Sequence, residues 1–162
     1  SSYKRQVGNP VSNAKVNGNY VHSIVALNEA LEGGFDEALM LDAEGFVAEG
    51  SGENFFIVKD DIIYSPKLDA CLDGITRRTI ISLAHELGIN FVEKKLTVED
   101  VHEADESFFS GTAAEVVPIN SLDNKAIGSG PRGPVTELLQ RTYFEQVRGN
   151  RDSNLTWHTF ID

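Results

Sequence analysis

"EALMLDAEGFVAEGSGENFFIVKDD", residues Glu37–Asp61, contains three apolar runs separated by small and charged residues. The runs 37–42, 46–50 and 54–58 have the length of β-strands, and the last two also have the Val, Ile and Phe content of strands. Ala43–Gly45 is typical of a turn, and Lys59–Asp61 is typical of a hairpin turn into the next apolar run, 62–65. We therefore predict a series of strands joined by short turns.

Three longer segments have the apolar spacing of amphipathic helices. They are 20–31, which ends at Gly33-Gly34, 75–88, which ends at Gly88, and 134–147, which begins with Pro134. Thr97 followed by Asp100 predicts a short capped helix. Further strands are expected at 90–96, 106–111 and 115–119, and a loop at 66–73. The pattern predicts a single domain of mixed α and β structure (α/β or α+β) with several hairpins.

Charge and cysteine content restrict the function classes. The chain has 25 acidic residues against 14 Lys and Arg, a formal net charge of −11. This charge repels phosphate backbones and anionic lipid, so we expect no nucleic-acid and no membrane partner. A single cysteine, Cys71, and the lack of a signal peptide favour a cytoplasmic location. The polar, irregular start is more typical of the middle of a longer protein, so we expect a fragment.

Lys15 and Glu49 are the candidate catalytic pair. Small neighbours such as Ala14 and Gly18 leave room for a bulky ligand beside Lys15, and Glu49 lies among small residues that allow a ligand to approach the backbone. A lysine that condenses with a carbonyl must attack uncharged, which requires a site that lowers its pKa. Taken singly, each residue also fits an ordinary role, as a solvated surface charge or as a hairpin cap.

Two turns could bind an anion. Gly74-Ile75-Thr76 opens a predicted helix, whose free N–H groups and positive dipole end favour phosphate. Gly111–Ala114 is a small, hydroxyl-bearing turn between two strands. Either turn could instead be purely structural.

Two other motifs are weaker. Gly128–Gly133 fits G-x-G-x-x-G but contains a proline and follows no clear strand, which favours an ordinary loop. Ser12–Lys15 fits S-x-x-K but lacks the S-D-N and K-T-G partners of a serine acylase. The four histidines and one cysteine lack metal-site spacing, so no metal is expected.

Five segments occur together in order: "AKVNGNY", "EALMLDAEGFVAEGSGENFFIVKDD", "DGITRRTI", "ADESFFSGTAAEVVPI" and "GPVTELLQ". The chain from about Asn9 to Val147 thereby resembles the class IV (fold-type IV) pyridoxal-phosphate aminotransferases. Within the class, "GNY", "EGSGEN" and "GTAAE" are most similar to the branched-chain amino-acid group. The resemblance implies the large, barrel-like C-terminal domain of these enzymes.

The resemblance also implies roles for individual residues. Lys15 would be the Schiff-base lysine, Tyr20 would hydrogen-bond the cofactor's phenolic oxygen, and Glu49 would face the pyridine nitrogen. The backbone amides of Ile75 and Thr76, together with Thr112, would hold the cofactor's phosphate. Thr112 and Ala113 would help to seat the substrate carboxylate, with Glu53 and Asn54 as supporting residues.

The implied reaction is transamination between leucine, isoleucine or valine and 2-oxoglutarate, with pyridoxal 5'-phosphate as cofactor. Residues 1–148 would form the cofactor-binding domain and 149–162 a tail. The smaller N-terminal domain of the family would be missing, so the chain alone would be largely inactive, and the whole protein would be a homodimer. D-amino-acid transamination, a lyase reaction of the same class, or a non-catalytic module with the same fold stay open alternatives.

Overall fold

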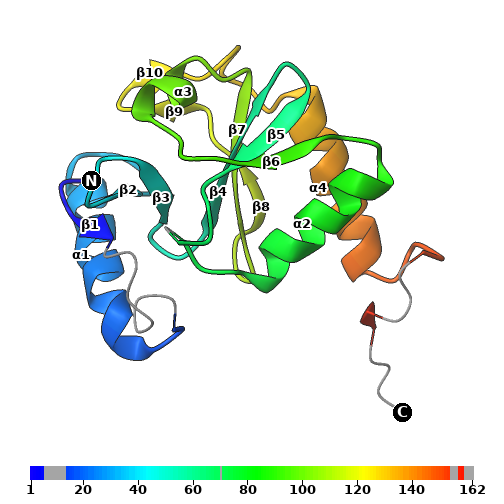
Figure 1. Cartoon of the computed structure of the whole chain (residues 1–162), viewed down its shortest axis with the longest axis horizontal. Coiled ribbons are helices and arrows are strands. Elements are labelled where there is room, and N and C mark those ends of the chain that lie inside the picture. The colour runs from blue at the N-terminus through cyan, green and yellow to red at the C-terminus, as the bar shows by residue number, and fades with distance from the viewer. Residues whose placement is uncertain (6–13, 70, 154–156, 159–162) are drawn as a thin grey trace.

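The computed structural model describes residues 1–5, 14–69, 71–153 and 157–158. Its central feature is a five-stranded sheet of order β6-β5-β4-β7-β8 (Figure 1). The strands are β4 (Asn54–Lys59), β5 (Ile62–Ser65), β6 (Phe91–Glu93), β7 (Glu106–Gly111) and β8 (Glu115–Pro118). The β6–β5 pair is parallel and the other pairs are antiparallel.

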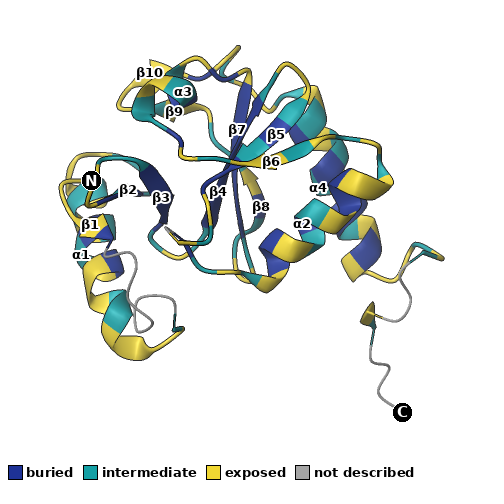
Figure 2. Cartoon of the chain, in the orientation of Figure 1, coloured by how far each residue is buried: buried dark blue, intermediate teal, exposed yellow. Residues whose placement is uncertain are grey.

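Both faces of the central strands are covered (Figure 2). Helices α2 (Ile75–Glu86) and α4 (Pro134–Val147) pack on one face, around Phe56 and Phe108, whose rings stack 4.7 Å apart. The opposite face, with Phe55 and Phe109, packs against β2 (Leu39–Asp42), β3 (Val47–Gly50) and α3 (Val98–His102). This double burial explains why β4 is a continuous apolar run instead of an alternating one.

A second sheet precedes the first. β1 (Lys4–Arg5) pairs parallel with β2, and β2 pairs antiparallel with β3. The 3₁₀ turn η1 (Asn17–Asn19) leads into α1 (Tyr20–Glu32), which buries only Ser23 and Ala26 and leaves much of its surface exposed (Figure 2). A small hairpin, β9 (Ser121–Leu122) with β10 (Lys125–Ala126), precedes α4.

The local signals in the sequence predicted most of these elements. α4 begins and ends where expected, and Asp60 and Asp61 form the predicted hairpin turn with positive φ of 51° and 59°. The strand expected over 90–96 is wrong in length, since β6 ends at Glu93. Leu96 instead accepts a hydrogen bond from the Val47 amide of the other sheet. Among the described residues, no helix is both long and apolar enough to cross a membrane.

Candidate active site

A cavity of about 360 Å³ lies where β3, the starts of α1 and α2, and the turn after β7 meet. Six of the seven predicted site residues line this cavity: Lys15, Tyr20, Glu49, Ile75, Thr76 and Thr112. Residues far apart in sequence thus come together as a single site. The seventh, Ala113, is exposed beside Thr112 in the same turn and does not line the cavity.

Glu49 is held by two donors. One carboxylate oxygen, Oε1, lies 2.8 Å from Arg5 Nε, and the other, Oε2, accepts from the Leu72 amide at 2.9 Å. The side chains of Arg5 and Glu49 are only 10% and 8% exposed. Burial raises the pKa of Glu49 above its ordinary value, and Arg5, the Leu72 amide and Lys15 oppose this rise. The site therefore holds a buried, oriented carboxylate whose ionised form depends on nearby cations.

Lys15 lies on the exposed side of the cavity. Its Nζ is 5.7 Å from the centroid of the Tyr20 ring. The residue before Lys15 is held by the 3₁₀ turn that follows, because Asn19 Nδ2 donates to the Ala14 carbonyl at 3.0 Å. The Lys15 charge also acts on Glu49, so the two ends of the expected cofactor site interact electrostatically.

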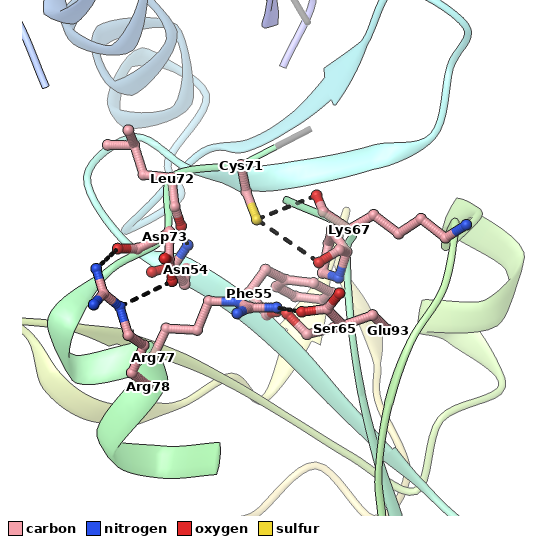
Figure 3. Close-up of polar contacts among 11 residues, drawn as sticks. Asn54, Phe55, Ser65, Lys67, Cys71, Leu72, Asp73, Arg77, Arg78 and Glu93 are labelled. Carbon is pink, nitrogen blue, oxygen red and sulfur yellow. Dashed lines mark hydrogen bonds and ion pairs between the residues drawn. The ribbon is translucent and has the colours of Figure 1, made fainter. Parts of the chain in front are cut away.

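Asn54 and Leu72 lie beside the start of α2 (Figure 3). The N-cap, Gly74, has no side chain to bond the first amides, and a Cβ added to it would collide with Asn54 Oδ1. Asn54 Nδ2 donates to the Leu72 carbonyl at 2.7 Å, and Glu49 accepts from the Leu72 amide. Both backbone polar groups of Leu72 are therefore hydrogen-bonded to side chains. The N–H groups of Ile75 and Thr76 therefore lie at an uncapped helix start on the cavity wall.

Arg77, in the first turn of α2, links this helix to β6 through an ion pair with Glu93. It is 2% exposed, and its Nη2 lies 2.5 Å from Glu93 Oε1 at the end of β6 (Figure 3). Arg78, in contrast, lines the cavity and pairs with Asp73 at 3.1 Å. The two adjacent arginines thus have different surroundings.

The start of α4 differs from that of α2. The Glu106 carboxylate accepts from the amides of Val135 and Thr136 at 2.9 and 2.7 Å. Because the protein's own carboxylate occupies this helix start, Gly128–Gly133 has no free anion site at its end. This agrees with its interpretation as a loop.

Glu53, for which the resemblance implies a supporting role, also lines the cavity. Burial raises the pKa of its carboxyl group; the Gly52 amide lowers it, and the neighbouring Glu37 raises it further.

The sequence did not predict the involvement of Arg5, Leu72 or Ser110 in the cavity wall. Arg5 lies in a polar start without any periodicity, and only its pairing with β2 places it at the site.

The described residues contain no group of three or more His, Cys, Asp or Glu side chains placed to hold a metal ion. Cys71 is buried, and its thiol donates to the carbonyls of Pro66 and Lys67 (Figure 3). Ser12 and Asn13 of the S-x-x-K motif lie outside the described residues.

Residues 1–122 match the family model of class IV amino-transferases, and the chain belongs to this family. The branched-chain-amino-acid aminotransferase of Pseudomonas aeruginosa is 54% identical over 162 residues, which are 99% of this chain and 53% of that protein. The probable branched-chain-amino-acid aminotransferase of Aquifex aeolicus is 44% identical over 162 residues, with shares of 98% and 52%. The chain thus spans about half the length of the curated relatives it matches.

Solved structures agree. A branched-chain amino acid aminotransferase crystallised in complex with N-(5'-phosphopyridoxyl)-L-glutamate superposes with a TM-score of 0.95 at 44% identity. The match covers 100% of this chain and 55% of that one. The enzyme of Thermoproteus uzoniensis with norvaline gives a TM-score of 0.92 at 47% identity, covering 98% and 53%. These matches confirm the predicted family and its mixed α/β fold.

Proposed function

We propose that the chain is the cofactor-binding part of a pyridoxal-phosphate-dependent aminotransferase. The reaction is the transfer of an amino group between a branched-chain L-amino acid (Leu, Ile or Val) and 2-oxoglutarate, in the cytoplasm. The observation that carries this proposal is that Lys15 and Glu49 line one cavity beside the uncapped start of α2. The similarity to branched-chain aminotransferases supports the choice of substrates.

The residues of the cavity fit the cofactor. The amides of Ile75 and Thr76 and the hydroxyl of Thr112 provide donors for a phosphate monoester. Glu49 provides a buried carboxylate that keeps a pyridine nitrogen protonated, and Arg5 holds that carboxylate in place. Tyr20 provides a hydroxyl on the same wall as Lys15.

Lys15 moves the proton in this scheme. When bound, pyridoxal phosphate supplies an aldehyde that condenses with amines and a ring that withdraws electrons from the substrate's α-carbon. The Lys15 amine would act as the general base and acid of the site, holding the proton that leaves that carbon. Thr112 and Ala113 lie in the turn where we place the substrate carboxylate.

The remaining half of the protein completes the site. We propose that residues 1–148 form the cofactor-binding domain with 149–162 as a tail, and that a separate N-terminal domain closes the cavity. Ser1 and Ser2 contact Glu29 of α1, and the Ser1 amine donates to the Leu39 carbonyl, so the first residues of the chain lie against α1 and β2. We propose a homodimer for the whole protein.

An absorption titration tests the proposed function. Adding pyridoxal phosphate to the chain should produce a visible band shifted from that of the free cofactor, and Lys15→Ala should abolish it. Lys125→Ala is the matched control, because Lys125 is an exposed lysine in β10 outside the cavity lining, and should keep the band. A band that survives Lys15→Ala, or no band in the unmodified chain, would contradict the proposal.

A further inference from the structure

Ser110 is a buried serine in the cavity wall whose hydroxyl has no partner. The residue is 0% exposed, and its Oγ has no hydrogen-bond partner among the residues that the structure describes. Buried hydroxyl groups are normally paired, and leaving one unpaired costs about 1–3 kcal/mol. Of the buried side-chain atoms in the described residues that lack a partner, that of Ser110 alone belongs to the cavity lining. Its position therefore suggests a ligand that supplies the missing bond.

The strand register places Ser110 at the phosphate end of the cavity. Side chains two residues apart on a strand share a face, so Ser110 is on the same face as Phe108, which packs in the cluster with α2. Ser110 is paired with Asn54 across the β4–β7 ladder, and Asn54 contacts the α2 N-cap, Gly74. Ser110 thus lies on the α2 side of the sheet, at the end where α2 begins.

Other hydrogen-bond donors near Ser110 line the same cavity. Thr112 follows Ser110 by two residues and lines the same cavity, as do Ile75 and Thr76. The Thr76 side chain is hydrogen-bonded to Tyr143, and its backbone amide lies at the uncapped start of α2. A serine hydroxyl reorients by rotation about one bond, so Ser110 can turn its hydrogen toward an anion held by these groups.

We infer that Ser110 is a further ligand of the cofactor's phosphate, in addition to the amides of α2 and Thr112. This inference rests on the proposed function. Ser110 Oγ donates to a phosphate oxygen, and binding removes the unpaired hydroxyl that the free chain carries. The unpaired hydroxyl thus slightly lowers the stability of the ligand-free chain, and the same hydroxyl makes a specific contact with the bound phosphate.

The test compares ligands with and without the phosphate. We would titrate the unmodified chain, Ser110→Ala and Ser107→Ala with pyridoxal phosphate and with pyridoxal. Ser107 is the matched control, because it is a buried serine of the same strand whose hydroxyl already donates to the Phe56 carbonyl at 3.0 Å, away from the cavity lining. Losing one hydrogen bond to a charged group should weaken pyridoxal phosphate binding about tenfold or more in Ser110→Ala.

The affinity of Ser110→Ala for pyridoxal should stay unchanged, and Ser107→Ala should leave the ratio of the two affinities unchanged. The thermal midpoint of ligand-free Ser110→Ala should equal or exceed that of the unmodified chain, because the variant lacks the unpaired hydroxyl. Equal losses for both ligands, or no loss for either, would overturn the role of Ser110. Failure of the unmodified chain to bind pyridoxal phosphate would instead overturn the proposed function.

Discussion

Arg5 and Glu49 form the buried ion pair of the site, and its strength can be measured. Removing one partner of a buried pair leaves an uncompensated charge, so Arg5→Ala should lower the free energy of unfolding by about 3 kcal/mol at neutral pH. Lys95→Ala is the matched control, since Lys95 and Glu44 form a pair with 43% and 62% exposed side chains, which water screens, and its loss should change stability much less. Equal losses in the two variants, measured by urea unfolding, would contradict this assignment.

The effect of Arg5→Ala should depend on pH. Burial raises the pKa of Glu49, so the folded state favours the protonated carboxyl group, and its contribution to stability falls as pH rises through the folded pKa. Arg5 offsets that fall only when Glu49 is ionised. The stability difference between the unmodified chain and Arg5→Ala should therefore be small at about pH 4 and grow toward pH 7. A difference that stays constant over this range would show that Arg5 does not act through the Glu49 charge.

Cys71 should be chemically inert in the folded chain. Burial, with a further contribution from the Glu49 charge, raises the pKa of its thiol to about 12. The reactive thiolate is therefore scarce near pH 8, and iodoacetamide should label Cys71 only after unfolding in guanidinium. Mass spectrometry gives the labelled fraction, and rapid labelling of the native chain would contradict this prediction.

At the scale of elements, α3 has a capping box that can be tested. Thr97 Oγ1 accepts from the Asp100 amide at 3.1 Å, and Asp100 Oδ2 accepts from the Thr97 amide at 2.8 Å. Thr97→Ala should lower the free energy of unfolding by about 1 kcal/mol. Thr97→Ser should retain most of the stability that the cap provides, because serine keeps the hydroxyl group. Urea unfolding distinguishes the two, and an equal loss in Thr97→Ser would indicate that the methyl group matters more than the cap.

Elements with local signals could be predicted from the sequence, and elements made by distant pairing could not. Gly88 with φ of 72° and Pro134 at the first turn of α4 are local signals that place helix ends correctly. β1 has only two residues and exists because it pairs with β2 more than thirty residues later. The same holds within the site: Lys15 and Glu49 could be selected by residue type and spacing, whereas Arg5 and Ser110 become evident only from register and burial.

At the scale of the whole molecule, several large apolar side chains are exposed on α1 and at the cavity. Val21, Ile24 and Leu31 on α1 are 58%, 57% and 53% exposed, and Ile75 at the cavity is 77% exposed. Apolar side chains exposed at this level are consistent with surfaces that another part of the protein covers. Because the chain spans about half of its relatives' length, we expect the rest of the protein to close the cavity.

The isolated chain should therefore have little or no transaminase activity. We expect the rest of the protein to exclude water from the 360 Å³ cavity and to complete the substrate pocket. Turnover of valine with 2-oxoglutarate should be near background even when the visible cofactor band is present. Turnover at the rate of the whole protein would show that these residues suffice for catalysis.

The most direct test of the account is covalent trapping at Lys15. Incubation with pyridoxal phosphate, reduction with borohydride and peptide mapping by mass spectrometry locate the lysine that has condensed with the aldehyde. We predict one phosphopyridoxyl group per chain, on the peptide that contains Lys15. Trapping spread over other exposed lysines such as Lys67 and Lys125, or no trapping at Lys15, would contradict the account.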